Sequence, residues 1–123
     1  IRRVVLCSGK VYYDLYEKRE AAGLEDVYLL RVEQLYPFPA RTLIQELGRF
    51  TNATEYIWCQ EEPKNMGAWT WIEPNLEWVL DHIGANASRA IYAGRPASAS
   101  TATGLAKRHQ TEQQTLVSEA LNA

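Results

Sequence analysis

The chain has 123 residues, of which 46% are hydrophobic and 23% charged, and its formal net charge is −2. This composition is typical of one globular domain, residues 1–123, with its own hydrophobic core. The near-neutral charge provides no basic surface for a nucleic-acid backbone, and no apolar run approaches the roughly 20 residues that a membrane helix needs.

Four continuous apolar runs predict β-strands, at residues 3–7, 26–32, 55–60 and 90–93. A stretch with apolar residues at helical spacing follows each run. We expect these helices at residues 11–22 before Gly23, at residues 43–50, from Pro74 to about residue 83, and at residues 105–121.

Strands that are apolar throughout, alternating with helices, favour a parallel sheet covered on both sides. The predicted fold class is α/β, with a mostly parallel sheet of four to five strands and helices on both faces. In such sheets, ligands meet the loops beyond the carboxyl ends of the strands. Residues 8–10, 33–37, 61–67 and 94–96 therefore mark the candidate site.

Cys7 and Cys59 both lie in apolar runs, which predicts buried free thiols in a reducing compartment. A metal site would need further ligands, such as a CxxC pair or clustered histidines, and the sequence has neither. We expect no metal site and no metal ligands in this chain.

Three glutamates lie at predicted strand ends. One is Glu33, and the other two are Glu61 and Glu62, which are neighbours in the sequence. Acid/base catalysis needs a shifted pKa and a reacting partner, but no nucleophile or catalytic triad spacing accompanies these glutamates. Capping of loop backbone, or pairing with Arg31, Arg41 or Arg95, is the favoured interpretation. We therefore predict no catalytic residue in the chain.

Two stretches allow phosphate binding as an alternative to a purely structural role. Residues 8–10 (SGK) open a helix, yet the P-loop and dinucleotide-binding motifs are both missing, so a plain turn is favoured. Residues 94–104 (GRPASASTATG) favour a tight loop in which Ser100, Thr101 or Thr103 caps the last helix.

Trp69 and Trp71 lie in a predicted loop and are candidates for an interface patch, because aromatic residues concentrate at protein contacts. If that patch is normally covered by other domains, the isolated chain should self-associate through it.

Four segments in order resemble the C-terminal domain of the 2-oxoglutarate dehydrogenase decarboxylating component. They are VLCSGKVYYD (5–14), RVEQLYPFP (31–39), WCQEEPKNMGAW (58–69) and YAGRPASAS (92–100). The resemblance covers essentially the whole chain. It implies a three-layer fold similar to the transketolase C-terminal domain. The chain also begins at Ile1 without a methionine, so we expect a C-terminal fragment of a larger multidomain enzyme.

Enzymes of this family use thiamine diphosphate and Mg²⁺ to decarboxylate 2-oxoglutarate in the citric acid cycle, and they pass the succinyl group to the lipoyl arm of dihydrolipoyl succinyltransferase. The resemblance implies that the preceding domains hold the cofactor and metal, since the family's GDG motif is not in this sequence. The fragment is then a structural and assembly domain, inactive alone, within a homodimeric enzyme of the bacterial cytoplasm or the mitochondrial matrix.

A regulatory module is the alternative that the resemblance leaves open. Some family members bind acetyl-CoA or AMP, and the acetyl-CoA site at the junction with the preceding domain uses the Gln of the EQL motif and a following Arg pair. Gln34 and Arg41 match, whereas Thr42 stands at the second Arg position. A sister domain, such as that of a pyruvate dehydrogenase β subunit, is a third interpretation, which the SGKVYYDL and GRPASAS segments disfavour.

Overall fold

The computed structural model describes residues 1–99 and 105–123, and it contains one sheet of four parallel strands. The strands are β1 (Arg3–Cys7), β2 (Val27–Arg31), β3 (Glu55–Pro63) and β4 (Ile91–Arg95), in the spatial order β2-β1-β3-β4. All three pairings are parallel. The prediction of a parallel sheet is therefore confirmed.

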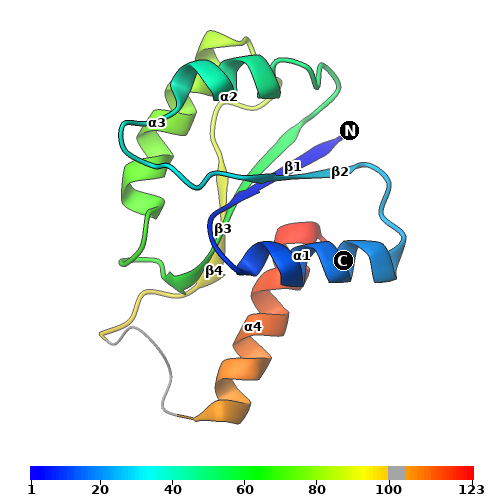
Figure 1. Cartoon of the computed structure of the whole chain (residues 1–123), viewed down its shortest axis with the longest axis vertical. Helices are drawn as coiled ribbons and strands as arrows, with labels where there is room; N and C mark the ends of the chain where they lie inside the picture. Colours follow the sequence, from blue (N-terminus) through cyan, green and yellow to red (C-terminus); the bar gives the residue numbers. More distant parts are fainter. Residues whose placement is uncertain (100–104) are drawn as a thin grey trace.

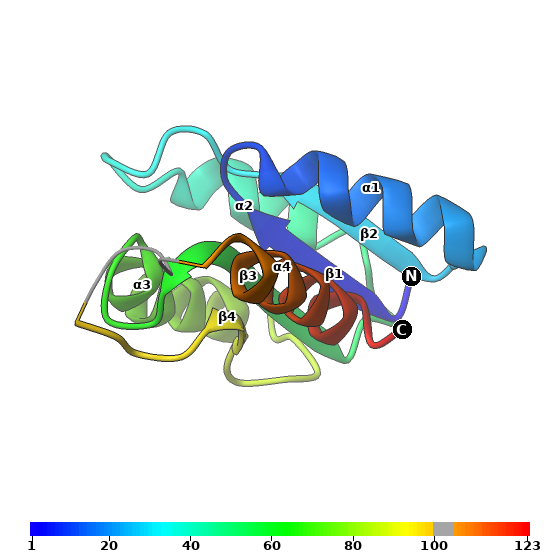
Figure 2. The same ribbon diagram turned by 90° about the horizontal axis from the view of Figure 1, so that it is seen from below.

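Helices cover both faces of this sheet, as predicted (Figures 1 and 2). The helices are α1 (Val11–Ala22), α2 (Ala40–Leu47), α3 (Trp69–His82) and α4 (Ala106–Leu121). Buried residues of α1 and α4 share one hydrophobic cluster, and those of α2 and α3 share the other. The domain therefore has three layers, α1 and α4, then the sheet, then α2 and α3.

The central position of β1 explains why every residue after Arg3 in this strand is apolar. All five of its residues are buried, because successive side chains point to opposite faces and both faces are covered. Val4 and Leu6 pack toward α2 and α3, whereas Val5 and Cys7 pack toward α1 and α4. The continuous apolar pattern thus reports burial on both sides.

Three elements differ from their predicted bounds by three residues or more. Helix α2 spans Ala40–Leu47 rather than residues 43–50. Strand β3 extends to Pro63, and α3 begins at Trp69 rather than at Pro74, which lies inside the helix. Proline in a helix interior removes one backbone hydrogen bond, so the sequence alone favours a start at the proline. The earlier start depends on a tertiary contact to the Trp69 amide, described below.

Cys7 and Cys59 are buried free thiols, as predicted, and they face each other in the β1–β3 register. Burial raises the pKa of the Cys7 thiol to about 12 and raises the pKa of Cys59 as well. Both thiols are therefore protonated at neutral pH, and a protonated thiol is a poor nucleophile.

Within residues 1–99 and 105–123, no three His, Cys, Asp or Glu side chains gather as they would around a metal ion. Among the helices of that same part of the chain, none has the length and apolar character needed to cross a membrane.

The buried Arg3 ties the amino end of the sheet to the last turn of α4. Its Nε donates to the carbonyl of Ala120 at 2.8 Å and its Nη2 to that of Glu119 at 3.0 Å, while Nη1 pairs with Glu55 at 2.5 Å. A cation at a helix C-terminus satisfies free carbonyls and complements the helix dipole. Arg3 therefore links residues that are more than a hundred positions apart in the sequence.

We predict that Arg3→Ala lowers the free energy of unfolding by about 3 kcal/mol, because it leaves the buried Ala120 carbonyl without its donor and removes the partly buried ion pair with Glu55. Arg2→Ala is the matched control, since Arg2 pairs with Asp26 and with the same Glu55 from a more exposed position, so its loss should cost much less than that of Arg3. Urea unfolding followed by circular dichroism measures both values. Equal losses in the two variants would contradict the role assigned to Arg3.

Candidate functional site

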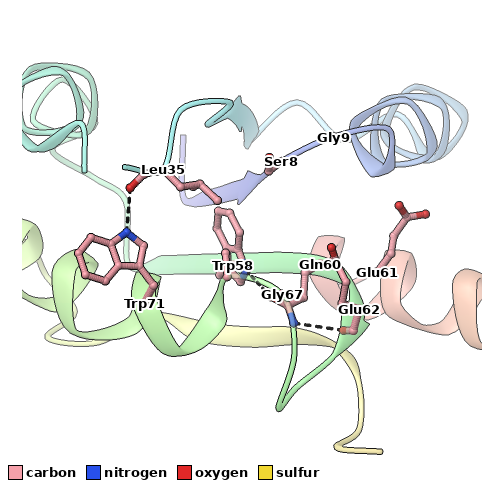
Figure 3. Close-up of a pocket in the computed structure, with 10 residues that line it drawn as sticks. Ser8, Gly9, Leu35, Trp58, Gln60, Glu61, Glu62, Gly67 and Trp71 are labelled. Atoms are coloured by element: carbon pink, nitrogen blue, oxygen red, sulfur yellow. Dashed lines mark hydrogen bonds between the residues drawn. The ribbon is translucent and has the colours of Figure 1, made fainter. Parts of the chain in front are cut away.

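A hollow of about 470 Å³ opens at the carboxyl edge of the sheet, where loops after β1, β2 and β3 converge. Figure 3 shows its lining, to which the turn after β3 and the start of α3 also contribute. The lining residues are Ser8, Gly9, Leu35, Trp58, Gln60, Glu61, Glu62, Gly67, Ala68 and Trp71. The hollow lies where the parallel-sheet rule predicted the candidate site.

Gln60 is a buried amide that holds one wall of this hollow. Its Nε2 donates to the carbonyls of Glu62 at 3.1 Å and Pro63 at 3.0 Å, the last two residues of β3, and to that of Met66 in the following turn at 2.8 Å.

The Oε1 atom of Gln60 accepts from the indole Nε1 of Trp58 at 2.9 Å and from the backbone N–H of Trp69 at 3.1 Å. Trp69 is the first residue of α3, whose first N–H groups have no partner within the helix. One side chain thus joins the end of β3, the turn and the start of α3.

Two glycines allow the backbone to come close to this amide. Gly67 has a φ of 68°, a conformation that side chains disfavour, and a Cβ there would lie 3.2 Å from Nε2 of Gln60. At Gly94, a Cβ would lie 2.8 Å from the Gln60 carbonyl and 2.5 Å from the Tyr92 hydroxyl. The β3–β4 register shifts here, between the Cys59 and Pro63 pairings, so the strands meet closely at a bulge.

Arg95 is buried, with 5% of its side chain exposed, and all three nitrogens of its guanidinium hydrogen-bond within the domain. It donates to the Glu61 carbonyl at 2.5 Å, to the Glu112 carboxylate at 3.1 Å and to Gln113 Oε1 at 3.0 Å. The backbone carbonyl of His109 accepts at 3.2 Å. Arg95 therefore fastens α4 to the ends of β3 and β4, and its charge is paired inside the fold.

Tyr92 strengthens the same junction. Its hydroxyl lies 2.5 Å from the Arg95 carbonyl, to which it donates. Burial is the main cause that raises the pKa of Tyr92 to about 12, so the hydroxyl stays a donor at neutral pH.

The carboxylate of Glu61 is engaged by its own chain, through Lys10 Nζ at 2.7 Å and Gln113 Nε2 at 2.8 Å. Of the three arginines predicted as candidate partners of the strand-end glutamates, Arg95 binds the backbone carbonyl of Glu61 and not its carboxylate. The Glu62 side chain is exposed, and its carboxylate has no hydrogen bond or ion pair within residues 1–99 and 105–123.

Glu33 pairs with Arg31 at 2.9 Å, as predicted, and also accepts from the N–H of Gly9 at 3.2 Å. These two contacts lower the pKa of the Glu33 carboxyl. The Glu33 carboxylate thus accepts from a backbone N–H of the turn before α1. Phosphate binding was the alternative prediction for this turn, residues 8–10. The predicted plain turn at residues 8–10 agrees with this contact, whereas the candidate caps Ser100, Thr101 and Thr103 lie outside the described residues.

The prediction that Trp69 and Trp71 lie in a loop was wrong. Both residues lie in the first turn of α3. Trp69 is buried in the core against Tyr92, with ring centroids 5.4 Å apart, so this chain already covers it. Trp71 is 41% exposed; its Nε1 donates to the Leu35 carbonyl at 2.8 Å, and its ring lies 5.8 Å from that of Tyr36. The interface prediction therefore stays a prediction for Trp71 and is wrong for the buried Trp69.

Gln34 and Arg41 are both exposed, one in the loop after β2 and the other in the first turn of α2. Neither side chain makes a hydrogen bond or ion pair with the part of the chain that the structure describes. They are free to contact a ligand, and the regulatory site that the resemblance assigns to them stays a prediction.

The whole chain matches one known family. The family model described as 2-oxoglutarate dehydrogenase C-terminal covers residues 1–121. The chain belongs to this family. It is also 67% identical, over 121 residues, to proteins named 2-oxoglutarate dehydrogenase E1 component from Brucella anthropi, Brucella ovis and Brucella canis. The match spans 98% of this chain but only 12% of the length of those relatives.

The organising role of Gln60 in this 2-oxoglutarate dehydrogenase C-terminal domain was not predicted from the sequence, and Arg95 was named only as one of three candidate partners of the strand-end glutamates. Gln60 and Arg95 have few exposed atoms and the largest hydrogen-bond sets at the carboxyl edge. The sequence did carry a signal for Gln60, because this polar residue continues directly from the predicted buried strand segment EYIWC (55–59). A polar side chain in such a place must find partners, because an unpaired buried polar group is costly.

We predict that Gln60→Ala destabilises the domain by about 3 kcal/mol, since it leaves the Trp58 indole N–H and the Trp69 amide without acceptors. Gln114→Ala is the matched control; Gln114 is an exposed glutamine of α4 and its loss should cost less than about 0.5 kcal/mol. Urea unfolding followed by tryptophan fluorescence measures both. Similar midpoints for the two variants would contradict the role of Gln60.

Proposed function

We propose that this chain is the C-terminal structural and assembly domain of a 2-oxoglutarate dehydrogenase E1 component. The complete enzyme would decarboxylate 2-oxoglutarate and transfer the succinyl group to lipoyl groups. The observation that supports this proposal best is the family match over residues 1–121 at 67% identity to E1 components. Because the chain spans only 12% of those relatives, the reaction itself is assigned to the complete polypeptide.

The described residues do not fit the role of a cofactor site. Thiamine diphosphate, which stabilises carbanions when bound, needs a Mg²⁺ ion held by oxygen ligands, and residues 1–99 and 105–123 bring no three His, Cys, Asp or Glu side chains together as around a metal ion. At the carboxyl edge, Gln60, Arg95 and Glu61 are engaged by their own chain. We therefore assign cofactor and metal binding to the preceding domains.

What this chain contributes is a fixed surface. The amide of Gln60 and the guanidinium of Arg95 make the strand ends rigid, and they hold Trp71 at the rim of the hollow. We propose that the preceding domains pack on this edge, and that the complete enzyme is a homodimer that works with dihydrolipoyl succinyltransferase. A bacterial cytoplasm is the proposed location, since the relatives named above are bacterial.

The proposal predicts that the isolated chain does not bind thiamine diphosphate in the presence of Mg²⁺ and does not decarboxylate 2-oxoglutarate. Isothermal titration calorimetry measures binding, with the complete enzyme as the positive control and circular dichroism to verify that the chain is folded. Micromolar binding by the folded chain alone would contradict a purely structural role. Binding by the complete enzyme and none by the chain is the expected result.

A further inference from the structure

Helix α3 has an apolar face that the domain itself does not cover. The helix buries Trp69, Ile72, Leu76, Val79 and Leu80 against the sheet and α2. On its outward side, Trp71, Pro74, Trp78 and His82 are exposed, and we call this row the α3 seam. Residues spaced three, four and seven positions apart share one side of a helix, so the seam is continuous over about 17 Å.

The most exposed part of the α3 seam is an aromatic stack. Trp78 is 55% exposed, and its ring lies 5.2 Å from that of His82 at an interplanar angle of 20°. A hollow of about 420 Å³ opens beside it, between Pro74 and the loop that follows the helix. The seam thus runs from Trp71, at the rim of the carboxyl-edge hollow, to a second hollow at the far end of α3.

A row of carboxylates flanks the α3 seam. Glu73, Glu77 and Asp81 are spaced four residues apart and form a line along the helix, which we call the acid row. Arg89 lies 3.6 Å from Glu77, a loose and exposed pair, and the other two carboxylates have no ion pair among the described residues. An apolar seam beside a negative row is complementary to a helix that carries apolar residues next to lysine or arginine.

We propose that the α3 seam and the acid row form the docking surface for a basic, apolar-faced segment of the preceding part of the same polypeptide. This inference rests on the proposed function. The relatives are about eight times longer than this chain, so the complete enzyme has ample preceding sequence. A second copy of the domain is a poor occupant, because two acid rows would face each other and repel.

Hydroxyl-radical footprinting of the wild-type complete enzyme tests this surface, with the isolated chain as reference. Oxidation of exposed Trp78 in the isolated chain sets the upper limit, and oxidation of buried Trp58 sets the lower limit in both proteins. Docking predicts that Trp78 in the complete enzyme falls to the level of Trp58. Unchanged oxidation of Trp78 in an active enzyme would overturn this inference while leaving the proposed function intact.

The charge and the source of the occupant need a second measurement. Asp81→Lys in the complete enzyme should restore oxidation of Trp78, whereas the control Glu17→Lys, on the exposed side of α1, should leave it protected. Carbodiimide cross-linking of Glu73 or Asp81 should join them to lysines of the preceding region. Cross-links to residues 1–123 of another copy, or to a different component of the complex, would overturn the proposal.

Discussion

The arrangement of the carboxyl edge depends on a single buried amide. Gln60 is fixed near the end of β3, where its five hydrogen bonds reach a neighbouring indole, two carbonyls at the end of the strand, one carbonyl of the following turn and the first N–H of α3. The turn cannot move without breaking several of these bonds, because amides buried away from water have no alternative partners. The start of α3, and with it the direction of Trp69 inward and Trp71 outward, follows from this constraint.

Buried arginines provide the second constraint, since they attach α4 to the sheet at both ends. Arg95 binds the first half of the helix and Arg3 its last turn. The charges at these positions are paired within the domain, and so is the Glu61 carboxylate that first suggested acid/base chemistry. Trp71, Trp78 and the acid row remain on the surface, and their cover by other protein in the complete enzyme is our proposal.

The sequence predicted the layers of the fold well and the details of the edge poorly, for a physical reason. Strands such as β1 are buried on both faces, so a run of apolar residues in the local sequence is enough to predict them. The start of α3 depends instead on an acceptor nine residues away, which no local pattern reports. Trp69 was placed in a loop for that reason. Gln34 and Arg41 were predicted as ligand contacts only through family resemblance, because exposed polar side chains carry no packing signal.

The side-chain amide protons of Gln60 report on the central constraint most directly. Hydrogen exchange of the glutamine Nε2 protons can be followed by NMR in the folded chain, with exposed Gln114 as the internal reference. The Nε2 group of Gln60 makes three hydrogen bonds to backbone carbonyls inside the fold. We therefore predict that its protons exchange far more slowly than those of Gln114, and only when the turn opens. Exchange of Gln60 as fast as that of Gln114 would contradict the account.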